Sequence, residues 1–319
     1  MTRTTAVTAL GATLLLLAQP VFATTEPSSD PAITAGGVSE GAAIARSGAA
    51  HRRHIHRHAR NGSGLPALRS SAALVIDEST AAVLMSKHAD VATPIASITK
   101  LMTALVVLDA GQALEEPLEI THDDLRLDKP TTSRLVLGTT LSRGDLLHLA
   151  LMASENRAAN ALGRNYPGGL GACVAAMNAK ARALGMSNTH FVEPTGLSSD
   201  NVASPADLSK LVIAVSKNTT IQSYSTDSRY MVPIGRRQVE FRNTDSLVLS
   251  SGWNIVVQKT GYIAEAGKCL VMKAIIEGRS VVIVLLDSIG RQTRLADARR
   301  IKKWMEARSN AEALRIAAR

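Results

Sequence analysis

Residues 95–108 read Ile-Ala-Ser-Ile-Thr-Lys-Leu-Met-Thr-Ala-Leu-Val-Val-Leu, and Lys100 is the single charged residue in this run. Such a run is typical of a buried helix, and Pro94 predicts that Ser97 lies in its first turn. A buried ammonium must find partners or lose its proton. Because Ser97 and Lys100 are neighbours on one helix face, the pattern predicts a general base beside a nucleophilic hydroxyl, at a helix end that favours negative charge.

Two further short motifs give this pair its weight. Ser-Glu-Asn at 154–156 follows an apolar stretch, and Lys-Thr-Gly at 259–261 ends a strand-like run. A Ser-x-x-Lys motif alone is expected about once by chance in a chain of this length. In the order Ser-x-x-Lys, Ser-x-Asn and Lys-Thr-Gly, however, the three motifs form the set of penicillin-binding proteins and class A β-lactamases. The order therefore predicts a serine acyl-transfer enzyme.

The flanks of these motifs carry a closer resemblance. Residues 95–105, 151–159, 191–197 and 258–267 resemble the low-molecular-mass D-alanyl-D-alanine peptidases, and most of all their endopeptidase branch. Glu155, where β-lactamases usually carry Asp, fits that branch. The resemblance implies a serine peptidase without a cofactor or metal that hydrolyses D-Ala–diaminopimelate cross-links of peptidoglycan peptide stems. It also implies covalent inhibition by β-lactam antibiotics.

By this resemblance, four residues form the catalytic group. Ser97 resembles the acylated nucleophile and Lys100 the base that takes its proton. Ser154 would pass a proton toward the leaving amine, and Asn156 would hold Lys100 and the substrate backbone. Each motif has a structural alternative, since Ser154 is also suited to cap a helix and a lysine can extend its amine to solvent. These alternatives do not explain three motifs in order with matching flanks.

The third motif is expected to bind the substrate. Lys259 would attract the substrate carboxylate and lower the pKa of Lys100 by like-charge repulsion, and Thr260 would hydrogen-bond that carboxylate. Gly261 would let an extended peptide approach the strand edge. By the same resemblance, the backbone N–H groups of Ser97 and Tyr262 would form an oxyanion hole.

Apolar runs at both ends of the chain predict the sheet. Those at 71–76 and 81–85 are separated by a polar turn, and the later runs lie at 253–260, 268–276 and 280–287. Helical periodicity covers residues 143–164, 170–184 and 293–307. We expect an α+β fold with an antiparallel sheet of about five strands flanked by helices and a helical insertion subdomain. The resemblance implies the same fold, of the penicillin-binding protein/β-lactamase type, with the active site between sheet and helices.

Composition divides the chain into four parts. Residues 1–23 have the pattern of a cleaved signal peptide, which predicts a periplasmic protein, and 24–66 resemble a disordered basic linker. Residues 67–308 form the expected catalytic domain, and 309–319 a helical tail. We expect at most loose membrane association, because no amphipathic anchor follows Trp304. The formal charge of +9 lies mostly after residue 66, which suits a carboxylate-bearing substrate.

Several other features argue against competing functions. Secretion and few aromatic residues exclude nucleic acid as a partner. The histidine-rich tract at 51–58 lacks a second ligand set for a metal. Residues 37–41 spell a nucleophile elbow without a preceding strand, and Ser-Asp-Asn at 199–201 lies in a polar stretch that predicts a loop.

Cys173 and Cys269 are expected to be buried free thiols.

Three alternatives remain open on the sequence. Glu193 follows the second motif at a distance comparable to the deacylating glutamate of class A β-lactamases, so a β-lactamase is possible in principle. A D-Ala-D-Ala carboxypeptidase would use the same motifs as an endopeptidase. A murein-binding module without turnover would keep the fold, although all catalytic residues are present.

Overall fold

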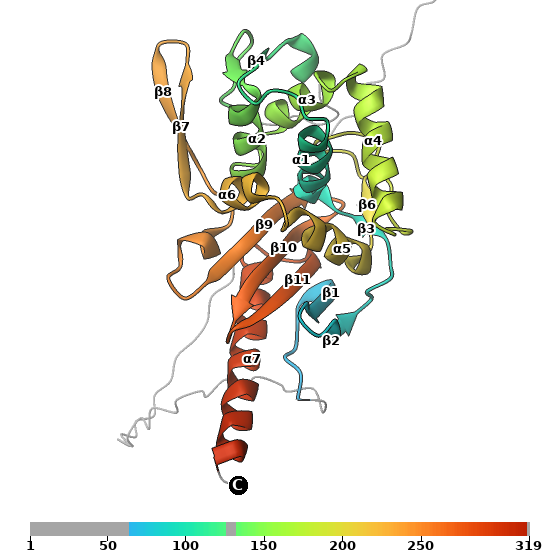
Figure 1. The fold of residues 1–319 in the computed structure, drawn as a ribbon, viewed down its shortest axis with the longest axis vertical. Coiled ribbons are helices and arrows are strands. Elements are labelled where there is room, and N and C mark those ends of the chain that lie inside the picture. Colours follow the sequence, from blue (N-terminus) through green and yellow to red (C-terminus); the bar gives the residue numbers. More distant parts are fainter. Residues whose placement is uncertain (1–63, 126–131, 318–319) are drawn as a thin grey trace, which may run out of the picture. The chain divides into compact units, whose positions relative to one another are not determined.

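A five-stranded antiparallel sheet organises the computed structural model, which describes residues 64–125 and 132–317 (Figure 1). The strand order is β2-β1-β11-β10-β9. The strands are β1 (Ser70–Asp77), β2 (Ala82–Lys87), β9 (Asn254–Ile263), β10 (Gly267–Ile276) and β11 (Arg279–Ser288). The predicted sheet from both chain ends is confirmed. A two-residue turn at Glu277 and Gly278, both with positive φ, joins β10 to β11 as a tight hairpin.

Alternate residues of the central strands serve two hydrophobic clusters. On β11, Val282, Val284 and Leu286 belong to one cluster, whereas Val281, Ile283 and Leu285 belong to the other. Helix α7 (Thr293–Ala317) covers the second face, and α5 (Pro205–Val215) contacts the first. Because helices cover both faces, the central strands are apolar throughout.

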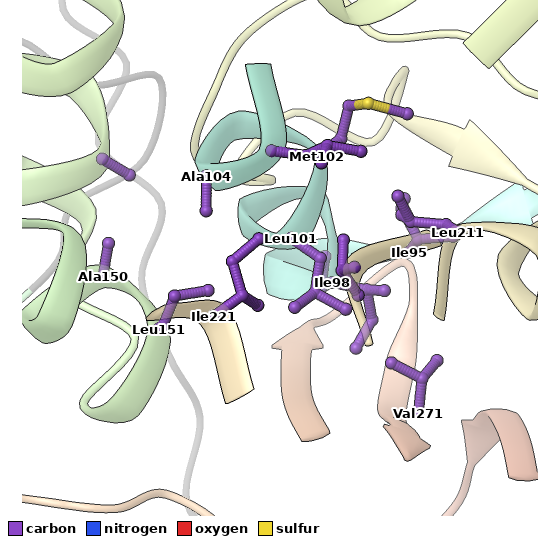
Figure 2. Close-up of a cluster of buried hydrophobic side chains, with 14 of the residues drawn as sticks. Ile95, Ile98, Leu101, Met102, Ala104, Ala150, Leu151, Leu211, Ile221 and Val271 are labelled. Carbon is purple, nitrogen blue, oxygen red and sulfur yellow. The ribbon is translucent and has the colours of Figure 1, made fainter. Parts of the chain in front are cut away.

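The larger cluster surrounds α1 (Thr99–Asp109), which is buried on nearly all sides. Figure 2 shows Leu101 of this helix near Leu151 and Ile221, and Ile95 near Leu211. The surrounding helices are α2 (Arg143–Met152), α3 (Asn156–Arg164), α4 (Gly169–Ala183), α5 and α6 (Thr219–Thr226). The predicted helical insertion between the sheet strands is therefore present.

Two predicted helix boundaries need correction. The single helix expected at 143–164 is two helices, because Ser154 adopts a left-handed conformation with φ of 60° and ends the ladder. The free carbonyl of Met152 at the end of α2 accepts a hydrogen bond from Thr244 N at 3.1 Å instead. The closing helix expected at 293–307 continues to Ala317.

Short strands and 3₁₀ turns complete the fold. The sequence pattern singles out none of the small sheets, in which β3 (Thr93–Pro94) pairs with β6 (Val202–Ala203), β4 (Pro117–Glu119) with β5 (Thr140–Ser142), and β7 (Arg229–Ile234) with β8 (Arg237–Arg242). The 3₁₀ turns are η1 (Ala96–Ile98), η2 (His122–Asp124) and η3 (Ser246–Leu249).

Predictions for the amino-terminal part lie largely outside the described residues. These are the signal peptide, the elbow at 37–41, the histidine-rich tract and most of the linker. Leu65, near the expected end of the linker, packs half-buried against the smaller cluster. Among the described residues, no helix combines the length and apolar character needed to cross a membrane. Cys173 on α4 and Cys269 on β10 are both buried free thiols.

Candidate active site

Ser97 and Lys100 meet at the junction of η1 and α1. Ser97 lies in the 3₁₀ turn just before α1 rather than in the first α-helical turn, and its Oγ is 2.8 Å from Lys100 Nζ. Ala96, the first residue of that turn, has a positive φ of 49°. This local strain raises Ser97 out of the regular helix while keeping it one turn from Lys100.

The other contacts of Lys100 fix the direction of its lone pair. Its Nζ donates to Asn156 Oδ1 at 2.7 Å and to the Thr195 carbonyl oxygen at 2.6 Å. Neither oxygen can donate a hydrogen bond in return. A neutral amine has two N–H groups, so both are used there and its lone pair is left for the Ser97 hydroxyl. This geometry suits a base that removes the hydroxyl proton.

Burial provides the neutral amine. Lys100 is 0% exposed, and this burial lowers its pKa to about 7, against the opposing charges of Glu193 and Glu155. Desolvation, rather than the ammonium of Lys259 that the sequence suggested, is thus the leading cause of the lowered pKa. The lowered pKa makes the neutral amine available near neutral pH.

The second and third motifs meet through Ser154 and Lys259. Lys259 Nζ donates to Ser154 Oγ at 2.9 Å and to the Thr260 carbonyl oxygen at 2.9 Å. The left-handed conformation of Ser154 allows this contact, because a continuous helix would have no break at which its hydroxyl could turn toward β9. Ser154 therefore lies at the break between α2 and α3 and does not cap either helix.

Other basic side chains influence the Lys259 ammonium. The pKa of Lys259 lies well below its usual range, first because of burial and then because of the charges on Lys100 and Arg294. Asp245 opposes these effects. Arg294, at the start of α7, was not among the sequence-predicted residues, and only its place in the fold relates it to the third motif. A bound carboxylate would favour the charged form of Lys259.

The third motif lies within β9, at the free edge of the main sheet. A Cβ atom on Gly261 would lie 3.0 Å from the Ile95 carbonyl oxygen and 3.1 Å from Ser97 N, so the missing side chain lets β9 approach η1. The Thr260 hydroxyl is 2.6 Å from the hydroxyl of Thr244. Tyr262 is 59% exposed and its ring contacts the Lys268 ammonium.

The loop that supplies Thr195 is organised by Glu193. The Glu193 carboxylate accepts hydrogen bonds from Thr195 N, Thr195 Oγ1 and Gly196 N at 2.5–2.6 Å, and from Asn201 Nδ2 at 2.9 Å. Asn201, the end of the second Ser-x-Asn sequence, is fully buried and also holds Val192 N at 2.7 Å. Ser-Asp-Asn at 199–201 lies in the predicted loop, where its asparagine braces Glu193.

Glu155 joins the second motif to the segment at 133–135. Its carboxylate accepts a hydrogen bond from Ser133 Oγ at 2.9 Å, and burial raises its pKa despite this bond. Arg157 Nη1 donates to the Leu135 carbonyl oxygen at 2.6 Å. The Glu155 carboxylate therefore links the second motif to the segment at 133–135.

Seven of the sequence-predicted residues belong to the three motifs, which the fold brings into contact, and Tyr262 directly follows the third motif. A family model described as D-alanyl-D-alanine carboxypeptidase, peptidase S11, matches residues 59–290. The chain belongs to this peptidase family. It is a serine-type D-Ala-D-Ala peptidase, as the resemblance of its motifs implied.

Relatives of this S11 peptidase include two with the name D-alanyl-D-alanine endopeptidase. The one from Pseudomonas aeruginosa is 47% identical over 249 residues, covering 76% of this chain and 80% of the relative. The one from Escherichia coli is 46% identical over 243 residues, covering 76% and 78%. Among solved structures, a Streptomyces DD-transpeptidase aligns with a TM-score of 0.71 and 26% identity, over 76% of this chain and 99% of that one. These matches agree with the predicted family and fold.

Nothing in the described part of the S11 peptidase resembles a metal centre: residues 64–125 and 132–317 contain no group of three His, Cys, Asp or Glu side chains placed to hold an ion. The residues that sequence analysis missed are Thr195, Arg294 and Thr244. Thr195 contributes only its carbonyl oxygen, which any residue type would provide.

Proposed function

We propose that this peptidase is a periplasmic D-alanyl-D-alanine endopeptidase, which hydrolyses D-Ala–diaminopimelate cross-links of peptidoglycan through an acyl-enzyme on Ser97. The observation that carries the chemistry is the buried Lys100 amine, 2.8 Å from Ser97 Oγ, with a pKa of about 7. The names of the relatives from Pseudomonas aeruginosa and Escherichia coli support the choice of substrate. The signal-peptide pattern of residues 1–23 supports the compartment.

Acylation begins with proton transfer. Lys100 takes the proton of Ser97, whose oxygen attacks the D-Ala carbonyl carbon. Asn156 and Thr195 hold the Lys100 amine before and after the transfer, so its nitrogen stays beside Ser97. The backbone N–H groups of Ser97 and Tyr262 stabilise the negative charge that develops on the carbonyl oxygen.

Departure of the amine completes acylation. Ser154 relays to the leaving nitrogen the proton that Lys100 took from Ser97, which returns Lys100 to its neutral form, and the Lys259 contact at 2.9 Å orients the Ser154 hydroxyl for that transfer. Lys259 and Thr260 bind the carboxylate next to the scissile amide. A cross-link and a terminal D-Ala both have a carboxylate there, so these two residues accept either substrate. Water then hydrolyses the ester and regenerates Ser97.

Slow hydrolysis of a β-lactam adduct follows from the contacts of Glu193. A β-lactamase of class A activates water with a loop glutamate. Here the Glu193 carboxylate is held by donors of its own loop, which include Thr195, Gly196 and Asn201. Because these donors occupy both carboxylate oxygens, an incoming water finds little free acceptor capacity on Glu193. This argues for a long-lived adduct and against a β-lactamase.

Purified enzyme, incubated with equal molar amounts of dimeric muropeptide and monomeric pentapeptide, tests the proposal. We expect faster release of monomers from the dimer than of D-alanine from the pentapeptide. Faster D-alanine release would identify a carboxypeptidase, sustained nitrocefin turnover a β-lactamase, and no turnover of any substrate a murein-binding protein. The Ser97→Ala variant should not be labelled by a fluorescent penicillin, whereas Ser199→Ala, the matched control, should be labelled like the wild type.

A further inference from the structure

The hairpin of β7 and β8 (residues 229–242), here called the basic hairpin, has an excess of positively charged side chains. It contains four arginines and one glutamate. Arg229 and Arg242, which pair at its base, have side chains that are 73% and 81% exposed, and Arg236 and Arg237 are exposed at its tip. Figure 1 shows this hairpin standing apart from the main sheet, beside α2. Such a surface attracts carboxylate-bearing ligands.

The base of the basic hairpin is rigidly attached. Tyr230 donates from its hydroxyl to Asp145 Oδ1 at 2.6 Å, and its ring lies 3.9 Å from the ring of buried His148 on α2. On the other strand, the Arg134 guanidinium stacks 3.8 Å from the centre of the Phe241 ring, and Arg134 also donates to the Glu240 carbonyl oxygen. These contacts hold the hairpin in one direction relative to the helices, so its charges are preorganised.

Thr244, which follows β8, connects the hairpin to the site. Its backbone N–H donates to Met152 O at 3.1 Å, just before the helix break at Ser154, and its hydroxyl is 2.6 Å from that of Thr260. In the proposed mechanism, Ser154 and Thr260 serve the leaving amine and the adjacent carboxylate. The base of the basic hairpin therefore lies on the leaving-group side of the site.

We infer that the basic hairpin binds the second stem peptide of a cross-link, the one that departs with the leaving amine. This inference rests on the proposed endopeptidase function and names its specificity surface. The departing stem continues beyond the scissile amide and carries further carboxylates, for which exposed arginines are suited ligands. A terminal D-Ala has no such continuation, so the hairpin favours cross-links over pentapeptide ends.

Glu240 sets a limit on which charges take part. It pairs with Arg242 at 2.6 Å and with Arg229 at 3.9 Å, and so neutralises part of the base. The tip arginines Arg236 and Arg237 carry no acidic residue within their turn. We therefore assign the larger contribution to the tip pair, with the base pair oriented by Glu240.

The test compares Arg236→Gln/Arg237→Gln with the control Arg182→Gln/Lys303→Gln, which removes two exposed charges from α4 and α7. We expect kcat/KM for dimeric muropeptide to fall about fivefold in the hairpin variant, which is typical of two exposed charge contacts, and less than about twofold in the control. Acylation by penicillin and cleavage of pentapeptide should change less than about twofold. The dimer preference should also decrease with added salt in the wild type but not in the hairpin variant.

The outcomes separate the two proposals. If the wild type cleaves the dimer and the hairpin variant cleaves it equally well, the inference is wrong and the endopeptidase function stands. Equal losses on dimer, pentapeptide and penicillin would reveal a structural effect and would also overturn the inference. If the wild type does not cleave the dimer at all, both proposals fail together.

Discussion

Two segments of the chain have nearly the same sequence, Ser-Glu-Asn at 154–156 and Ser-Asp-Asn at 199–201, and the structure uses them differently. In the first, the serine turns toward Lys259 and the asparagine toward Lys100. In the second, the asparagine is buried against Glu193, while Ser199 lies half-buried in a turn. The difference lies in what each segment faces. One segment contacts two buried amines, and the other fills the interior of a loop.

If the first segment acts through Lys100, changing this lysine should have the largest effect. Lys100→Arg is expected to reduce penicillin acylation by about a thousandfold, because a guanidinium stays charged and cannot take the Ser97 proton. Stopped-flow acylation measures the rate, and Lys210→Arg on exposed α5 surface is the control. Acylation within about tenfold of the wild type would mean that Lys100 is not the base.

The second segment should instead determine stability. Asn201→Ala removes five hydrogen bonds to Glu193 and neighbouring atoms, so we expect a loss of about 3 kcal/mol in the free energy of unfolding. Urea unfolding measures this loss, with exposed Asp200→Ala as the control. The comparison breaks down if Asn201→Ala unfolds like the wild type and only the acylation rate drops.

Ser154 should show the opposite behaviour. We expect Ser154→Ala to slow acylation about a hundredfold, through loss of the proton relay, with a change in unfolding free energy below about 1 kcal/mol. Ser154→Gly should be equally slow but at least as stable, since glycine adopts the φ of 60° without strain. A fast Ser154→Gly enzyme would show that the residue serves only to break the helix.

The pH dependence of acylation sharpens the comparison further. Because the pKa of Lys100 is lowered to about 7 and its neutral form is the base, the acylation rate should rise with pH and level off above that midpoint. Asn156→Asp places a carboxylate beside Lys100 and should move the midpoint up by about one pH unit. The reverse change, Asp200→Asn in the second segment, should leave it in place. A pH-independent rate in the wild type would contradict the assigned base.

The smallest effect is expected at Ser199. Ser199→Ala should leave both acylation and unfolding free energy within about 0.5 kcal/mol of the wild type, because this serine lies only half-buried in a turn, outside the core. The same kinetic and urea measurements apply. A loss comparable to that of Ser154→Ala would give the second segment a role in the reaction.

Local sequence predicted most of the sheet and the first motif, since both follow from periodicity and from residues only a turn apart. The strands at 268–276 and 280–287 were correctly located because apolar runs and turn residues define them. The buried surroundings of Lys100 also follow from its own helix. The family resemblance supplied the roles of the other two motifs.

The break at Ser154 could not be predicted in this way. Periodicity continues through 143–164, and the left-handed conformation is stabilised by partners distant in sequence, which are Lys259 at the serine hydroxyl and Thr244 at the end of α2. The basic hairpin has the same origin, because its attachment depends on His148 and Arg134 from other elements. Contacts between distant residues decide these features.

Two glycines lie against the turn that carries Ser97. A Cβ atom on Gly196, whose φ is +82°, would lie 1.9 Å from the Ala96 carbonyl oxygen, and one on Gly261 would lie 3.1 Å from Ser97 N. The position of Ser97 is thus set by contacts between main-chain atoms. No flexible side chain lies between them that could adjust to a change in spacing. One added methyl group at Gly196 would therefore force the Ala96 main chain, and with it Ser97, to move.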